Sequence, residues 1–214
     1  MTAVPQRGRT ARRRPGRPRG QDSAVIRESA LRAAVDLIAR QGFAATSMSQ
    51  VAEAAGISPS GLAHHFPSKK ALLGAVLAYR DVMDNEGGLR LDDEAWTCFD
   101  QLVDVAAVNS TRHQLVLLYT TMVGEAVTED HPAHPWMAGH FRDVLASLSA
   151  CLIRDQELGR VRADAPVGTI ARQMVALMDG LQVQWLLDDS VDMVAILRQY
   201  VDDLKATWGT TPSA

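Results

Sequence analysis

A cluster of small and hydrogen-bonding side chains occupies the short segment "SPSGLAHH" at residues 58–65. The members that could contact another molecule are Ser58, Pro59, Ser60, Gly61, Ala63, His64 and His65. The serines and histidines can donate and accept hydrogen bonds, and the small residues allow close approach of a partner's backbone. The sequence shows no nucleophile elbow and no paired-carboxylate site, so we expect this segment to recognise a partner and the protein not to be an enzyme.

Two short helices must position these residues. An apolar run over 50–55, with Ser49 as the expected N-cap, predicts the first helix, and Gly56 supplies the positive φ of a tight turn. The second helix is expected over 59–65. Neither helix is long enough to be stable alone, so both must pack on longer neighbours. The pattern predicts a helix-turn-helix whose second helix presents its outer face to the major groove of DNA.

Longer amphipathic helices flank this unit. One is predicted to begin near Asp22 or Ser23 and to end at Gly42 as a C-cap. The other is expected over 69–86, where Lys69 and the free N–H groups of the first turn can contact a phosphate.

Residues 44–81, "AATSMSQVAEAAGISPSGLAHHFPSKKALLGAVLAYRD", resemble the DNA-binding domain of the tetracycline-repressor (TetR) family. The segment 176–193 resembles a helix junction of actinobacterial members. The resemblance implies an all-α homodimer, with DNA binding by 21–68, a linking helix over 69–86, and effector binding and dimerisation by 90–214. It adds Thr46 and Ser47 to the DNA contacts. Ala63 stands where the family usually has Tyr, so one backbone contact is in doubt.

The N-terminal arm, residues 1–20, carries seven arginines and no acid, and its Pro, Gly and Arg composition predicts disorder. "GRP" at 16–18, with Arg17 and Arg19, resembles an AT-hook that lies in an A·T minor groove. We favour a generic basic arm over this alternative. Residues 81–214 carry nine basic and twenty-one acidic side chains, so nucleic acid should contact only the first third of the chain.

The remaining chain predicts five helices, near 93–108, 110–128, 134–157, 166–187 and 190–207. Aromatic and methionine side chains suggest an apolar effector pocket formed by Trp96, Phe99, Tyr119, Met122, Trp136, Phe141, Met174 and Met178. Apolar stripes on the last two helices predict a two-fold four-helix dimer interface through Ile170, Leu177, Leu181, Trp185, Val194, Leu197, Val201 and Leu204.

Other features of the sequence indicate the cellular compartment and bear on whether a metal or cofactor is bound. Cys98 and Cys151 lie far apart in apolar segments and are interpreted as core residues in a reducing compartment, with a disulfide as the lesser alternative. No membrane span or secretory signal is evident, so a cytoplasmic, nucleoid-associated location is expected. The pattern H-x2-H-x5-H at 131–140 is explained by turns and capping, so neither a metal nor another cofactor is expected.

These observations favour a ligand-responsive transcriptional regulator. We expect a homodimeric repressor that binds a palindromic operator in double-stranded DNA and is released by a small apolar effector. The alternative is an architectural A·T-tract binding protein that relies on its arginine-rich arm, with a C-terminal domain that only dimerises.

Overall fold

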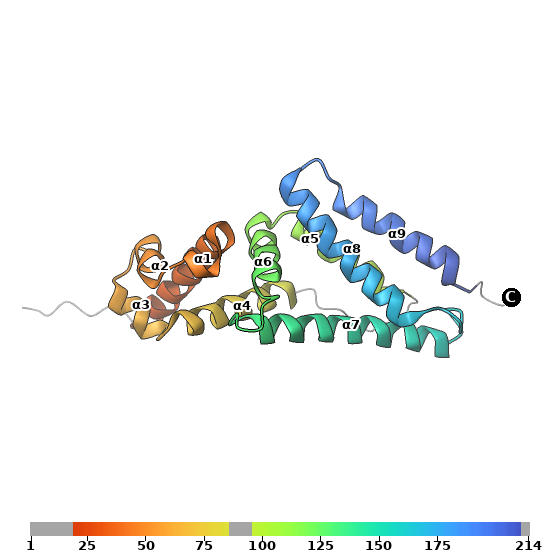
Figure 1. Ribbon diagram of the computed structural model, residues 1–214, viewed down its shortest axis with the longest axis horizontal. Coiled ribbons are helices and arrows are strands. Elements are labelled where there is room, and N and C mark those ends of the chain that lie inside the picture. The colour runs from red at the N-terminus through yellow and green to blue at the C-terminus, as the bar shows by residue number, and fades with distance from the viewer. Residues whose placement is uncertain (1–18, 86–95, 211–214) are drawn as a thin grey trace, which may run out of the picture.

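The computed structural model describes residues 19–85 and 96–210, and within these ranges the chain forms nine α-helices (Figure 1). Their bounds are α1 (Arg19–Ala45), α2 (Met48–Ala54), α3 (Pro59–His65), α4 (Lys69–Asn85), α5 (Thr97–Asn109), α6 (His113–Glu125), α7 (His134–Glu157), α8 (Val167–Leu187) and α9 (Met193–Trp208). The all-α prediction is confirmed. The described part contains one isolated β-bridge, between Val161 and Gly209, and none of its helices is long and apolar enough to cross a membrane.

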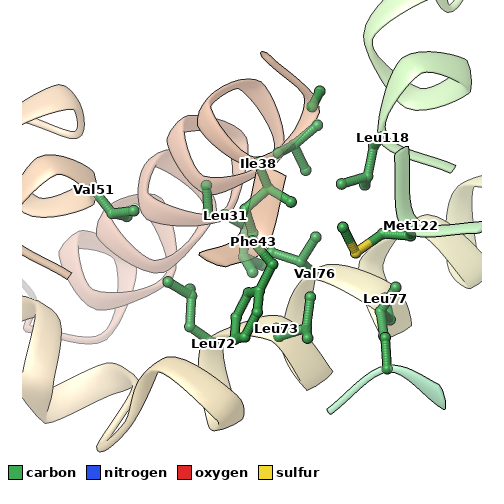
Figure 2. Close-up of a cluster of buried hydrophobic side chains, with 14 of the residues drawn as sticks. Leu31, Ile38, Phe43, Val51, Leu72, Leu73, Val76, Leu77, Leu118 and Met122 are labelled. Carbon is green, nitrogen blue, oxygen red and sulfur yellow. The ribbon is translucent and has the colours of Figure 1, made fainter. Parts of the chain in front are cut away.

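The helices enclose two hydrophobic cores. The first joins α1–α4 to α6 and to the start of α7, and Figure 2 shows Leu118 and Met122 of α6 facing Ile38 and Val76. The second is formed by α5, α8, α9 and the C-terminal half of α7. Because α7 contributes Met137 to the first core and later residues to the second, it connects both. Figure 1 shows α7 beginning beneath α6 and running along the base of the molecule under α8 and α9.

Helix α1 breaks at Gly42, as predicted. Gly42 has φ 80° and ψ 166°, a region that only glycine adopts readily, although helical hydrogen bonding resumes as far as Ala45. The break releases the backbone N–H of Phe43, which donates to both carboxylate oxygens of Glu125 in α6, at 3.2 and 3.0 Å. A methyl group at position 42 would overlap the carboxylate end of Glu125, so the backbone conformation favours glycine and a larger residue would also displace Glu125 from Phe43.

Several predicted boundaries need correction. Ser47, not Ser49, caps α2: its hydroxyl accepts from the N–H of Gln50, whose side chain accepts from the N–H of Ser47. This reciprocal arrangement satisfies two N–H groups at once, which a cap at Ser49 would leave unbonded. The predicted helix over 110–128 is shorter, because residues 110–112 form a turn before α6. Helix α1 extends back to Arg19, and the rest of the predicted arm, 1–18, lies outside the described residues.

Replacing Gly42 with alanine should destabilise the protein by about 1–3 kcal/mol from the backbone conformation alone, with the overlap against Glu125 adding to this. The measurement is urea unfolding followed by circular dichroism. Gly74→Ala is the matched control, because Gly74 lies in the exposed face of α4 with open space around its Cα. That change should stabilise the protein by up to about 1 kcal/mol. Equal urea midpoints for wild type and Gly42→Ala would contradict the conclusion that the break in α1 favours glycine.

Candidate nucleic-acid interface

The helix-turn-helix forms from local signals that the sequence displays. Gly56 adopts φ 68° in the turn, and the N–H of Ile57 donates to the carbonyl of Ala52 at 2.9 Å, which closes the end of α2. Ser58 caps α3 by accepting from the N–H of Gly61 at 3.0 Å. Leu62 is fully buried against the first core, so the opposite side of α3 is turned toward solvent.

The outer face of α3 brings the predicted contact residues together. Its exposed members are Ser58, Pro59, Ser60, Ala63 and His64, and its half-buried members are Gly61 and His65. The two histidine rings meet edge to face with centroids 5.4 Å apart. A methyl group at position 61 would lie 3.1 Å from the Ser58 hydroxyl oxygen, so glycine there protects the cap as well as keeping the surface flat. This face can hydrogen-bond to base edges and phosphates.

Two residues that precede α2, Thr46 and Ser47, use their hydroxyl groups for hydrogen bonds inside the protein. Thr46 is buried, and its hydroxyl donates to the carbonyl of Gly42 at 2.8 Å, so the expected contact of Thr46 with DNA is wrong. Ser47 is half-buried and its hydroxyl caps α2. Thr46 instead stabilises the break in α1. Its position in the sequence, directly before the capping Ser47, gave no sign of this role.

Lys69 lies where α1 and α4 meet. Its ammonium group donates to the carbonyl of Ala44 at 2.9 Å and lies 4.4 Å from the centre of the Phe43 ring. An ammonium has three donors, so a phosphate contact by Lys69 stays a prediction. Arg17 lies outside the described residues, and Arg19 is the first residue of α1.

Comparison with known proteins agrees with this geometry. Residues 30–76 match the profile of "Bacterial regulatory proteins, tetR family", and residues 105–206 match that of "BetI-type transcriptional repressor, C-terminal". The chain belongs to the TetR family of transcriptional regulators. The match over residues 30–76 covers α2, the turn and α3, together with most of α1 and part of α4.

Individual HTH-type regulators match the chain over shorter stretches. The chain is 31% identical over 114 residues to the uncharacterized HTH-type transcriptional regulator YvdT of Bacillus subtilis, covering 51% of this chain and 56% of the relative. It is 43% identical over 66 residues to the HTH-type transcriptional regulator RutR of Escherichia coli, covering 31% of this chain and 30% of RutR. The chain therefore spans about half of YvdT or less than a third of RutR.

Solved structures share the whole fold. Salmonella enterica GusR superposes with a TM-score of 0.65 at 26% identity, over 84% of this chain and 94% of GusR. SmeT, the repressor of the Stenotrophomonas maltophilia multidrug efflux pump SmeDEF, gives a TM-score of 0.69 at 20% identity, over 89% of this chain and 94% of SmeT. A structure of SmeT in complex with triclosan gives 0.72, also at 20% identity, over 87% of this chain and 93% of that one.

The residues expected to line one effector pocket divide between the two cores. Trp96, Phe99, Met174 and Met178 belong to the second core. Tyr119 and Met122 belong to the first, against which Trp136 and Phe141 pack. Spacing along a helix identifies apolar side chains but does not show which core receives them, so the sequence could not separate the two groups.

A buried polar cluster that the sequence analysis missed lies where α4, α6, α7 and α8 meet. Arg80 of α4 is only 7% exposed, and its guanidinium lies 4.2 Å from the Tyr119 ring centre and 5.7 Å from that of Trp136. The Tyr119 hydroxyl donates to Asp179 of α8 at 3.2 Å. His140 stacks on Trp136 with ring centroids 5.3 Å apart and planes 11° apart. This polar cluster joins the linking helix to three helices of the C-terminal part.

Burial dominates the electrostatics of the polar cluster. It raises the pKa of Asp179 to about 6, against the opposing effects of the Tyr119 hydroxyl and the positive charge of Arg80. At neutral pH Asp179 is therefore mostly ionised but poised close to protonation. The local sequence around Asp179 gives no sign of this role, because its neighbours Arg80 and Tyr119 come from α4 and α6.

The dimer prediction needs a correction. Five of the residues assigned to the interface are buried inside the second core of one chain: Ile170, Leu181, Leu197, Val201 and Leu204. They cannot also form the surface of a partner contact. Leu177, Trp185 and Val194 are half-buried, so their assignment stays a prediction. The exposed apolar residues of α8 and α9 are instead Val183, Leu187 and Ile196.

The three histidines at 131–140 serve separate local contacts. His131 lies 3.4 Å from Glu125 and packs edge to face on Phe43, while His134 bonds to the carbonyl of Ala126 at 2.8 Å. His140 belongs to the polar cluster. Across the described ranges, no group of three or more His, Cys, Asp or Glu residues is arranged to hold a metal ion.

Replacing His64 with alanine should weaken operator binding while leaving the fold intact, because this side chain is exposed and its ring lies edge to face with the neighbouring histidine ring. Loss of a base or phosphate contact costs about 1–3 kcal/mol, or roughly 5- to 150-fold in affinity. The measurement is a gel shift at fixed salt. Thr207→Ala, an exposed polar position in α9, is the control and should bind like wild type. Unchanged affinity of His64→Ala would remove His64 from the interface.

The polar cluster should make stability depend on pH. Because the pKa of Asp179 is higher in the folded protein than in the unfolded chain, the folded state binds more protons between about pH 4 and pH 6. Stability from this group should therefore fall as pH rises through that range, by up to about 1.4 kcal/mol per pH unit. Asp179→Asn should lack this slope. Urea unfolding of both proteins at pH 4.5, 5.5 and 6.5 measures it, and parallel curves would refute it.

Proposed function

We propose that this protein is a ligand-responsive transcriptional repressor that binds a palindromic operator as a homodimer. The observation that carries the proposal is the course of α4. This helix begins at Lys69, shortly after α3 ends at His65, and it inserts Arg80 among the rings and carboxylate of the polar cluster. A single rigid element therefore connects the DNA-reading face to a buried polar group in the C-terminal part.

The polar cluster is the candidate effector-sensing region. A small apolar or aromatic molecule that enters beside Tyr119 and Trp136 would compete with the contacts that hold Arg80. Displacement of Arg80 moves α4 and hence α3. The effector shifts the population only if it binds the DNA-incompetent state more tightly. Triclosan, a small aromatic compound, is bound by the structural neighbour SmeT, which supports this ligand class.

The homodimer would form through the outer faces of α8 and α9. Val183, Leu187 and Ile196 are exposed there. An open groove of about 590 Å³ runs over the first turns of α8, lined by Pro166, Val167, Gly168, Thr169, Arg172, Gln173 and Ala176. Small residues at 168 and 176 let a second helix approach closely. Pairing with two-fold symmetry would place the two α3 helices for successive major grooves of a palindrome.

Footprinting tests the proposal directly. DNA from the gene's own upstream region is incubated with the full-length protein and digested. A regulator protects one short palindrome, whereas an architectural protein protects A·T-rich tracts of any sequence. The family match and the exposed α3 face support the first outcome. Protection spread over A·T tracts, without a preferred palindrome, would reverse the proposal.

Deletion of residues 1–18 tests the basic arm and leaves α1 intact. Six of the seven arginines are removed, and each arginine that contacts a phosphate contributes roughly 0.9 to the slope of log affinity against log salt. The slope should flatten by about 2–4, because not all six contact DNA at once. Binding of both proteins is measured at several salt concentrations, on operators with A·T-rich or G·C-rich flanks.

A generic arm predicts equal losses on both kinds of flank, and an AT-hook predicts a larger loss on A·T-rich flanks. An unchanged salt slope would show that the arm does not contact DNA.

A further inference from the structure

The two cysteines of the chain, distant in sequence, meet inside the second core. Cys98 lies in the first turn of α5 and Cys151 lies in α7, and their side chains are 1% and 4% exposed. The two thiols are hydrogen-bonded to each other. The sequence favours two separate core residues, with a disulfide as the lesser alternative, and the fold makes the two cysteines neighbours.

The hydrogen bond between the thiols favours ionisation of one of them. Cys98 donates to Cys151, which lowers the pKa of the Cys151 thiol to about 7, while the same bond and burial raise the pKa of Cys98. A thiolate is the nucleophilic form of cysteine, and a second thiol in contact with it is the arrangement that resolves an oxidised sulfur. The N–H of Trp96, at the start of α5, donates to the buried Asp155 of α7 at 2.9 Å, so a hydrogen bond also joins the two helices that carry the cysteines.

We propose that Cys98 and Cys151 form a redox-active dithiol, which a hydroperoxide oxidises to a disulfide between α5 and α7. The Cys151 thiolate attacks the outer oxygen of the peroxide, the O–O bond breaks, and the leaving alkoxide or hydroxide takes up a proton. The sulfur of Cys98 then attacks the resulting sulfenic acid, an S–S bond forms, and water leaves with the Cys98 proton. Two thiols lose two electrons, and the hydroperoxide is reduced to an alcohol and water.

The oxidant must be small. The two cysteines are only 1% and 4% exposed, so an oxidant reaches them only through a local opening of the structure. A small local opening admits hydrogen peroxide more readily than a glutathione disulfide or a protein disulfide, which need much wider exposure. The site is therefore selective for small hydroperoxides.

Oxidation has a structural route to the rest of the protein. Helix α7 has 24 residues, about 36 Å at 1.5 Å per residue, and it runs from the second core to the first. Its N-terminal half carries Trp136 and His140 of the polar cluster, which contact Arg80 and Tyr119. A covalent bond at Cys151 thus acts on the helix that also supports α4. This second step rests on the proposed function, whereas the disulfide chemistry does not.

The chemistry is tested on the full-length protein with hydrogen peroxide and mass spectrometry under non-reducing conditions. Trypsin releases Cys98 within residues 91–112 and Cys151 within 143–154, and the chain has no other cysteine. The expected product is these two peptides joined, within one chain, and separated by dithiothreitol. A disulfide between two chains, seen as a doubled mass on a denaturing gel, would overturn the proposal. So would sulfinic acid without any joined peptide, or no change at either cysteine.

Two variants distinguish the attacking thiol, Cys151, from the resolving thiol, Cys98. Cys98→Ser keeps a hydroxyl donor beside Cys151 and should accumulate a sulfenic acid at Cys151 that dimedone traps. Cys151→Ser removes the thiol whose hydrogen bond raises the pKa of Cys98, but burial still raises that pKa, so trapping at Cys98 should be weaker than trapping at Cys151 in the other variant. Thermal unfolding of each variant checks the fold, and the wild-type peptide result decides the proposal even if a variant unfolds. Equal trapping in both variants would contradict the assigned roles.

Operator binding before oxidation, after it and after re-reduction is a separate measurement. A reversible change supports the α7 route. An unchanged affinity together with a joined peptide overturns the coupling but leaves the dithiol and the proposed repressor function standing.

Discussion

The orientation of the helix-turn-helix depends on how α6 holds the broken end of α1. Where α1 breaks at Gly42, the N–H of Phe43 loses its helical acceptor and both oxygens of Glu125 replace it. Hydrogen bonds to a charged group contribute about 1.5–3 kcal/mol, and an unbonded N–H at this half-buried place would cost a similar amount. Thr121 adds a bond to the carbonyl of Ala39 at 3.3 Å. The end of α1 is thus fixed to α6 by polar contacts that require one geometry.

The same junction also receives α4. Lys69 bonds to the carbonyl of Ala44 and lies over the ring of Phe43, so the residues after the break join α1 to the start of the linking helix. The first core therefore includes α6 as a full member, and the DNA-binding part does not end at residue 68 as a separate packing unit. Movement of α4 or α6 would change the position of α1. Helices α2 and α3 would move with α1 because they pack on it. Two structural paths thus lead from the C-terminal helices to the α3 surface.

The parts of the fold that the sequence predicted are those that depend on neighbours along the chain. Gly42 at the break, Gly56 in the turn and Ser58 with Pro59 at the start of α3 act within a few residues, so their roles were readable. The dimer residues were misassigned because an apolar stripe at helical spacing looks the same whether it faces its own core or a second chain. Ile170 and Leu197 face their own core. Neither the contact between the thiols nor the polar cluster could be assigned from sequence spacing, because their members come from different helices.

The polar cluster is costly for stability, and this bears on its role. Burial raises the pKa of Asp179 even though Tyr119 and Arg80 both favour its charged form, so desolvation outweighs the favourable contacts. Replacement of buried charged groups by apolar residues is often neutral or stabilising. A chain that needed only a stable bundle would have no use for Arg80 and Asp179 at the meeting point of four helices. Departures from the best-packed arrangement occur mainly at functional sites, and this one lies on the helix that begins beside the DNA-reading face. Displacement of Arg80 or Asp179 would change how α4 packs against α6, α7 and α8, which is the coupling that the proposed sensing role needs.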